Sequence, residues 1–290
     1  MRFTSILLFG LCLFAGTAKR TATAQSLLDG LEVAPLVITP VSATFKDTRI
    51  INVQSNETPG KNVLHFVIAH RFGQINEGAY ALWGLDNASM RMAFDYGVTN
   101  RLAVGVARST FQKTYEANVK WRALRQNSDN SMPISLTLYS VAMANGLRWA
   151  DPTRENLFSS RLSYVHQAIF AKKWGSNLSL AFIPSFIHRN LVESLADAHD
   201  QWTLGVGGRY KVTSRASINA EYHYALAGLP TDHVNSLSLG MDIETGGHVF
   251  QLHVTNSQGM FERAFLTETG GRWRDGALYF GFNLSRVFDF

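Results

Sequence analysis

Hydrophobic and polar residues alternate along most of the chain from about residue 62 onward. In SMRMAFDYGV, residues 89–98, Met90, Met92, Phe94 and Tyr96 share one face, and Arg91 is among the residues of the other. Alternation with a period of two is typical of β-strands whose two faces differ chemically. About 12 segments show this pattern, at residues 63–72, 89–98, 101–107, 116–123, 134–144, 157–171, 177–188, 201–211, 216–225, 236–245, 248–256 and 277–288.

The connections between these segments fall into two groups. Short connections at 98–101, 172–176, 212–215 and 245–247 alternate with mostly longer ones at 73–87, 145–156, 189–200, 226–235 and 257–276. Short turns at one rim and long loops at the other are typical of outer-membrane barrels. The pattern therefore predicts an all-β fold, a transmembrane antiparallel up-and-down β-barrel of about 12 strands. An even strand number places both ends of the barrel at the short-turn, periplasmic rim.

The chemistry of the two strand faces decides between a soluble and a membrane barrel. A soluble β protein points its apolar face inward, whereas a membrane barrel points it to lipid and keeps polar groups inside. Here one face carries almost no charge, and the long loops, the signal sequence described next and the lack of disulfides favour the membrane barrel. The polar face supplies the predicted lumen-lining residues, which are Arg91, Asp95, Glu116, Lys120, Arg122, Arg161, Arg209, Glu221, His223, Asp242 and His253.

The first residues predict export. A basic Arg2, an apolar run over 6–14 and the small residues Ala22 and Ala24 form a secretory signal peptide, cut after Ala24 or after Ala18. Removing residues 1–24 takes away three basic residues, so the formal charge falls from +5 to 27 − 3 − 22 = +2. The one cysteine, Cys12, lies in this segment, so the rest of the chain forms no disulfide. We expect a signal peptide over 1–24, a periplasmic segment over 25–61, with a short strand near 42–53, and an outer-membrane barrel over 62–290.

Three stretches resemble a known family. Residues 50–73 (IINVQSNETPGKNVLHFVIAHRFG), 84–109 (GLDNASMRMAFDYGVTNRLAVGVARS) and 245–260 (TGGHVFQLHVTNSQGM) are similar to the bacterial outer-membrane β-barrel family named domain-of-unknown-function family 5777. The resemblance covers most of the chain after the signal. It implies the barrel fold and the outer membrane of a Gram-negative bacterium, and it assigns no catalytic or binding residue.

Motifs for catalysis or metal binding are weak. None of the nine histidines forms an HxxxH or HExxH pair, and no GxSxG motif occurs. His223 and His253 share the polar face with Glu221, yet lumen hydrogen bonding explains them more simply than a metal site does. GVGGRY, residues 205–210, lies within an alternating strand, so its glycines relieve crowding or allow a bend. We expect no enzyme activity, cofactor, metal or nucleic-acid partner, with an outer-membrane hydrolase as one alternative.

HRFG at 70–73 and GLDN at 84–87 form the most distinctive local feature. His70, Arg71 and Asp86 could belong to a ligand or ion site at the barrel mouth. Alternatively, Arg71 and Asp86 could form a clamp that folds the first long loop onto the barrel. We favour the clamp, because irregular backbone at a barrel mouth needs fixed hydrogen-bond partners.

The state of the lumen stays open at this stage. Eight-stranded barrels are filled by side chains and barrels of 16 or more strands hold water, so about 12 is intermediate. The mixed charges could line a narrow or gated pathway for a small polar solute. They could instead pair across the lumen and close it, which would suit a structural or docking barrel. The pattern slightly favours the pathway.

The last residues, GFNLSRVFDF, predict how the barrel closes. The final strand must pair with the first so that no open edge remains in the membrane. Phe288 and Phe290 then lie at the periplasmic interface, where a terminal aromatic resembles the signal recognised by the barrel-assembly machinery. The expected partners are this machinery, outer-membrane lipid and a small polar solute.

Overall fold

The described residues form a closed barrel of twelve strands. A computed structural model describes residues 38–290, except 193, 196, 227, 228 and 231. The expected signal peptide lies outside these residues. The strands are β1 (Val63–Gln74), β2 (Ala88–Gly97), β3 (Leu102–Ser109), β4 (Tyr115–Leu124), β5 (Ser135–Ala144), β6 (Leu162–Trp174), β7 (Leu178–Arg189), β8 (Asp200–Lys211), β9 (Ala216–Ala225), β10 (Ser236–Thr245), β11 (His248–Thr255) and β12 (Tyr279–Asp289). The helices are η1 (Ile75–Glu77), η2 (Ala79–Gly84), η3 (Phe111–Lys113), η4 (Phe158–Arg161), α2 (Glu262–Thr267) and η5 (Trp273–Asp275).

Every strand pairs antiparallel with its neighbours in sequence, and β1 pairs with β12 to close the sheet. In this seam Leu64 faces Phe288 and Ile68 faces Leu284. The Phe290 N–H continues the pairing by donating to the Asn62 carbonyl at 3.2 Å. No strand edge remains unpaired, so the sheet itself supplies the hydrogen-bond partners of the wall backbone, as a hydrocarbon environment requires. The predicted fold and its closure at the last strand are thus confirmed.

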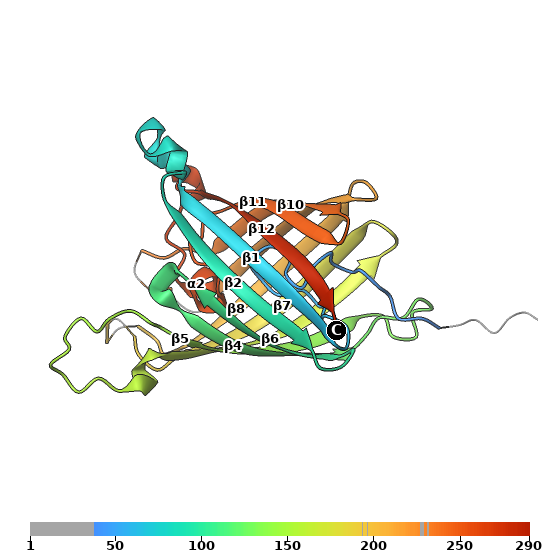
Figure 1. The fold of residues 1–290 in the computed structure, drawn as a ribbon, viewed down its shortest axis with the longest axis horizontal. Coiled ribbons are helices and arrows are strands. Elements are labelled where there is room, and N and C mark those ends of the chain that lie inside the picture. The colour runs from blue at the N-terminus through green and yellow to red at the C-terminus, as the bar shows by residue number, and fades with distance from the viewer. Residues whose placement is uncertain (1–37, 193, 196, 227–228, 231) are drawn as a thin grey trace, which may run out of the picture. The chain divides into compact units, whose positions relative to one another are not determined.

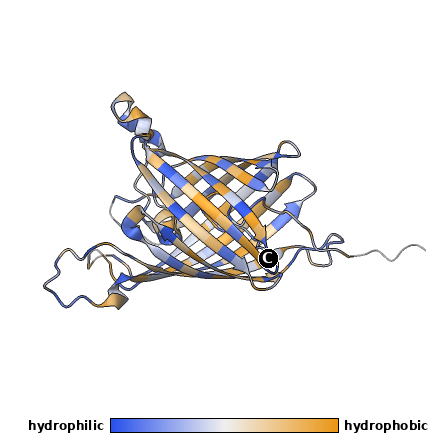
Figure 2. Cartoon of the chain, viewed as in Figure 1, coloured by the Kyte–Doolittle hydropathy of each residue, from blue (hydrophilic) through white to orange (hydrophobic). Residues whose placement is uncertain are grey.

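Hydrophobic and hydrophilic residues alternate along the wall strands (Figure 2), and the apolar ones are exposed while the polar ones are buried. Phe94, Val106 and Phe182 are 42 %, 57 % and 46 % exposed. Arg91 and Glu116, which alternate with such residues, are 2 % and 4 % exposed. Large apolar side chains outside and ionic groups inside are the arrangement of a membrane barrel. Among the described residues, no helix is long and apolar enough to cross a membrane.

The lipid-facing assignment gives a first testable prediction at Phe94. Its ring stacks on Phe66 of β1 with centroids 4.8 Å apart, on the outer face. Replacing Phe94 by Arg should destabilise the folded barrel by about 2–4 kcal/mol in urea titrations in lipid vesicles, because a cation at midplane depth loses its hydration. Tyr96→Arg, on the same face but at the strand end, should cost only about 0–1 kcal/mol. Equal effects at both positions would contradict the assignment.

Two segments that are not strands lie inside the barrel (Figure 1). One is residues 44–56, which we call the lumen hairpin. The other is the buried part, residues 256–269, of the loop 256–278, which contains α2 and which we call the outer loop. The hairpin falls within the segment that the sequence predicted to lie in the periplasm. Its burial against wall strands places it in the lumen instead, because Phe45, Ile50 and Val53 find their apolar cover there.

Candidate functional site: the occupied lumen

The lumen hairpin is a short turn that enters and leaves through one rim. Arg49 and Gln54 face each other in an antiparallel bridge, the Ser55 N–H donates to the Thr48 carbonyl at 2.9 Å, and the Ile50 N–H donates to the Val53 carbonyl at 2.8 Å. Before the hairpin, residues 39–41 bond to the β4–β5 connection, and after it the chain runs directly into β1. Both legs therefore pass the short-turn rim, and withdrawal of the hairpin requires no threading of the chain.

A single carboxylate holds the tip of the hairpin. Glu221, on the lumen face of β9, accepts the consecutive backbone N–H groups of Ile51, Asn52 and Val53 at 3.1, 2.9 and 3.2 Å. Its side chain is 1 % exposed. Hydrogen bonds to an ionised group are stronger than neutral ones, and three converging donors satisfy the buried charge. Glu221 thus fixes both the depth and the orientation of the tip.

Wall residues on several other strands also form hydrogen bonds with the hairpin. The Asn52 amide donates to Ser238 at 2.8 Å, and the Gln251 and Asn283 amides donate to the Ile50 and Ile51 carbonyls at 2.6 and 3.1 Å. On the opposite wall, the Lys120 ammonium donates to the Thr48 carbonyl at 2.8 Å and to Gln54 at 3.0 Å. These contacts come from β4, β10, β11 and β12, so the hairpin lies across the lumen.

Glycines in the wall form sockets for the two isoleucines of the tip. A Cβ atom at Gly207 of β8 would lie 2.5 Å from Ile50 Cδ1, and one at Gly240 of β10 would lie 3.1 Å from Ile51 Cδ1. Both distances are shorter than ordinary contact between carbon atoms. The sequence predicted that the glycines of GVGGRY relieve crowding, and at Gly207 the crowding group is the hairpin.

These sockets give a prediction with an internal control. Gly207→Leu should displace the hairpin and expose it, because a branched side chain would occupy the space of Ile50. Gly208→Leu should leave the hairpin seated, since Gly208 faces outward beside Leu180. Hydrogen exchange of residues 44–56, measured on refolded protein, should rise at least about tenfold in the first variant only. Equal exchange in both variants would show that Gly207 is not a socket.

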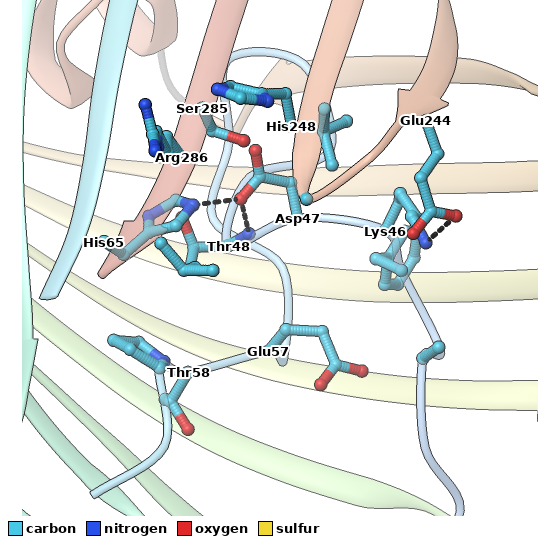
Figure 3. A pocket seen from close by; sticks show the side chains of 16 residues that line it. Lys46, Asp47, Thr48, Glu57, Thr58, His65, Glu244, His248, Ser285 and Arg286 are labelled. Carbon is cyan, nitrogen blue, oxygen red and sulfur yellow. Dashed lines mark hydrogen bonds and ion pairs between the residues drawn. The ribbon is translucent and has the colours of Figure 1, made fainter. Parts of the chain in front are cut away.

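A cavity of about 370 Å³ lies where the hairpin meets the short-turn rim (Figure 3). Asp47 of the hairpin accepts the His65 Nε2–H from β1 at 2.8 Å, and Lys46 pairs with Glu244 of β10. Burial raises the pKa of the Asp47 carboxyl, but His65 and hydrogen bonds from Ser285 and Thr48 outweigh it and lower the pKa to about 2. Asp47 is therefore ionised at neutral pH and ties the hairpin to β1.

The outer loop lies in the lumen beside the hairpin. Phe261, Ala264, Phe265 and Leu266 are buried around α2. They pack with the hairpin and with an apolar patch on the inner face of β5, β6 and β7, which consists of Tyr139, Val141, Met143, Val165, Ile169, Ala171, Ala181, Ile183 and Ile187. The Arg189 guanidinium fixes the end of α2 by donating to Thr267 Oγ1 at 2.6 Å. The lumen therefore contains its own hydrophobic core.

Most of the charges that the sequence predicted to line the lumen do so. Arg91 and Glu116 form a bidentate ion pair, with Nε–Oε1 and Nη2–Oε2 distances of 2.8 and 2.7 Å. Asp95 accepts from Asn118 at 3.2 Å. The remaining contacts are Arg122 with Glu57 at 3.3 Å, Arg209 with Ser217 at 3.0 Å and the Ala43 carbonyl at 3.3 Å, and Asp242 with Gln251 at 2.6 Å. Each of these charged wall residues therefore has a polar partner, either on the wall or in residues 43–57.

Arg161 lies elsewhere. It ends η4 at the long-loop rim, where its guanidinium donates to the Asn145 and Leu147 carbonyls at 2.7 and 2.5 Å and lies 3.9 Å from the Trp149 ring centroid. The β6 strand begins only at Leu162, so strand alternation does not direct Arg161 inward. Its contacts instead hold the β5–β6 connection.

The predicted clamp between Arg71 and Asp86 does not form. Side chains alternate along β1, so Arg71 points into the lumen, whereas Asp86 lies in an exposed part of the first long loop. Arg71 donates to the Ser257 carbonyl at 2.6 Å and to Asn52 Oδ1 at 2.8 Å, and so binds the outer loop and the hairpin. His70 points outward and stacks on Phe282 at 5.1 Å. The three residues therefore form no common mouth site.

The two lumen histidines have separate surroundings. His253 Nε2 lies 2.9 Å from Arg71 Nη2, and the His223 ring packs 5.4 Å from the Phe265 ring. The part of the chain that the structure describes contains no group of three or more His, Cys, Asp or Glu side chains arranged for a metal ion. On the outer face, Ser140 and His166 hydrogen-bond at 2.8 Å.

Sequence patterns did not identify the hairpin, the outer loop or their anchors Glu262 and Asn52. One available signal was the apolar inner face of β5–β7, because Tyr139, Val141 and Ile183 alternate with outward apolar residues. A strand that is apolar on both faces needs apolar cover on both. The other signal was the apolar content of residues 45–53 in a segment expected to be in water.

The chain is similar to solved structures of outer-membrane proteins. The NanC porin has a TM-score of 0.50 at 9% identity, covering 78% of this chain and 99% of that chain. The COG4313 outer membrane channel from Pseudomonas putida F1 has a TM-score of 0.46 at 13% identity, with 80% and 97% covered. Outer membrane phospholipase A from Escherichia coli has a TM-score of 0.43 at 13% identity, with 78% and 90% covered. Among curated proteins, none matches this sequence.

At 9% identity the likeness to the NanC porin shows the β-barrel fold alone. The family model described as "Membrane bound beta barrel domain (DUF5777)" matches residues 45–288. The match includes nearly all of the lumen hairpin, the whole wall up to the end of β12 and the outer loop. The chain therefore belongs to this family of membrane-bound β-barrel domains.

Proposed function

We propose that this protein is a gated outer-membrane pathway for small polar solutes, closed in the present state by its own lumen hairpin. The observation that carries the proposal is the mode of closure. A segment joined to the barrel at the short-turn rim blocks the lumen, and its polar contacts to the wall include Glu221, Gln251 and Asn283. Hydrogen bonds to water can replace such contacts, so the hairpin can leave while every strand stays paired.

The wall behind the hairpin suits a polar solute. The inner faces of β8–β11 carry small hydroxyl and glycine residues together with a few carboxylates and amides. They include Thr203, Gly207, Ser217, Ser236, Ser238, Gly240 and Thr255. Water or a solute with several hydroxyl or amide groups could bond to this surface once the hairpin has withdrawn. Facing it, the buried side chains of Lys120 and Arg122 on β4 supply N–H donors.

Conductance of purified protein tests the proposal. The full chain in a planar bilayer should be mostly closed. A variant lacking residues 40–57, with residues 258–270 replaced by a short Gly-Ser linker, should conduct steadily and admit small sugars and amino acids into liposomes. Folding is checked by the shift in gel mobility on boiling. A folded variant that conducts no ions and admits no solute would overturn the proposal.

The same result would favour the second candidate function, a closed structural or docking barrel. The observation behind this candidate is the amount of buried apolar surface in the lumen, where hairpin and outer loop share a core with β5–β7. A hydrolase has less support: Ser140 and His166 hydrogen-bond on the outer face, and a catalytic set also needs a third group that orients the imidazole. We place the protein in a Gram-negative outer membrane, where the barrel-assembly machinery would recognise Phe288 and Phe290.

A further inference from the structure

The two segments that close the lumen contact each other at its centre. Glu262, the first residue of α2, is 0 % exposed and belongs to the outer loop. Its Oε1 atom lies 2.8 Å from the Arg49 guanidinium and accepts the Gln54 amide at 3.2 Å. Arg49 and Gln54 are the bridged pair that faces across the hairpin. One carboxylate from the long-loop side therefore binds both strands of the hairpin from the short-turn side.

A wall residue makes a second, independent link. The Arg71 guanidinium uses one nitrogen to bind the Ser257 carbonyl at the base of the outer loop, at 2.6 Å. Its other terminal nitrogen binds Asn52 Oδ1 at the hairpin tip, at 2.8 Å. The guanidinium is planar and its donors have fixed directions, so a shift of either partner misaligns the other.

The apolar core adds a third link. Phe45, Ile50 and Val53 of the hairpin belong to the same buried cluster as Phe261, Phe265 and Leu266 of the outer loop. Close-packed interiors transmit displacement, because moving one member leaves a void beside the others. Neither segment can leave the lumen while the other keeps all of its present contacts.

The outer loop is also anchored at the long-loop rim. Glu268, which directly follows α2, pairs with Arg263 at 3.2 Å and accepts the Gln112 amide of η3 at 3.2 Å. Gln112 also binds Arg263. These contacts join the outer loop to η3 and to the wall, and none of them involves the hairpin. The loop therefore has one set of anchors near the outside and another set on the hairpin.

We propose that Glu262 and Arg49 form a relay across the membrane, through which displacement of the outer loop releases the lumen hairpin toward the short-turn rim. This rests on the proposed gated function and names its regulation from outside the cell. When the outer loop moves away, the Arg49 guanidinium, whose side chain is only 11 % exposed, loses its carboxylate partner in a buried site. A buried charge without its partner is strongly unfavourable, so the hairpin then leaves for water.

Hydrogen exchange of the hairpin amides tests the relay without reference to conductance. In the full-length protein, Glu262→Gln should raise exchange over residues 44–56 at least tenfold, although the substituted residue belongs to the outer loop. Glu268→Gln is the matched control, because it removes a carboxylate from the same loop but has no contact with the hairpin. It removes only a contact at the long-loop rim and keeps the Glu262–Arg49 contact in place, so the outer loop stays seated and exchange over residues 44–56 should not change.

A substitution of the other partner, Arg49, still tests the relay if Glu262→Gln fails to fold. Thermodynamic coupling is reciprocal, so Arg49→Gln should raise exchange in residues 258–268 by a similar factor. The relay is wrong if Glu262→Gln and Glu268→Gln affect the hairpin equally, or if Arg49→Gln leaves the outer loop unchanged. Failure of the gated pathway would appear separately, as a folded double-deletion variant that does not conduct.

Discussion

Replacing Glu221 by alanine is expected to increase the population of unseated hairpin at least about 100-fold. The variant leaves three buried N–H groups, those of Ile51, Asn52 and Val53, without their acceptor. Each unsatisfied buried donor costs about 1–3 kcal/mol, and every 1.4 kcal/mol is about a tenfold change in population. Three donors together therefore correspond to a change of about two powers of ten or more.

Trypsin measures this population, because the hairpin contains Lys46 and Arg49 and the protease cuts only a chain that has left the lumen. Glu244→Gln is the control. Glu244 also pairs with the hairpin, through Lys46, but its side chain is 39 % exposed, and exposed ion pairs contribute only about 0–1 kcal/mol. Cleavage of the control should change less than about fivefold. Similar cleavage of Glu221→Ala and wild-type protein would contradict the claim that Glu221 holds the hairpin in the lumen.

Replacing Arg91 by leucine is expected to destabilise the folded barrel by about 3–5 kcal/mol, because it leaves the carboxylate of Glu116 buried without its partner. The pair spans from β2 to β4 over β3, where Ala107 and Ser109 are small enough to let the two side chains meet. Both side chains are almost completely buried. The measurement is urea unfolding of refolded protein in lipid vesicles.

The double variant Arg91→Leu with Glu116→Leu shows whether the lost stability comes from a buried, unpaired carboxylate or from the absence of the ion pair itself. Replacing both ions by apolar residues of similar volume is often neutral or stabilising. The double variant should therefore recover most of the stability that the single variant loses. A double variant as unstable as Arg91→Leu alone would show that the site needs the ions themselves, for instance to hold water around the outer loop.

Strand alternation made the wall predictable from sequence. The period of two in residues such as Phe94 and Asp95 gives both the strands and the inward direction of Arg91, Glu116 and Glu221, because each residue's face follows from its position in the strand. Closure at β12 followed from the need to pair every strand edge. These are local or topological rules, and they need no knowledge of distant partners.

The contents of the lumen were not predictable by the same rules. The hairpin tip binds a carboxylate 170 positions away, and no local pattern in residues 44–56 specifies that partner. The clamp between Arg71 and Asp86 was inferred from the need of the first long loop for hydrogen-bond partners, but alternation along β1 directs Arg71 into the lumen. Arg161 was misplaced because the predicted strand began at residue 157, five residues before β6, where the backbone from Phe158 to Arg161 forms η4 instead.

A disulfide between the hairpin and the wall tests most directly whether the hairpin closes the barrel. A Cβ atom at residue 207 would lie 3.7 Å from both Ile50 Cγ1 and Cγ2, the positions that a cysteine sulfur at residue 50 would occupy, so a small adjustment of the hairpin brings the two sulfurs to bonding distance. With Cys12 the one native cysteine, the pair Ile50→Cys and Gly207→Cys can be followed without interference after export. In isolated outer membranes this pair should cross-link under mild oxidation, while Ile50→Cys with the outward-facing Gly208→Cys should not. Absence of the first cross-link in a folded barrel, or equal yields from the two pairs, would contradict a hairpin seated in the lumen.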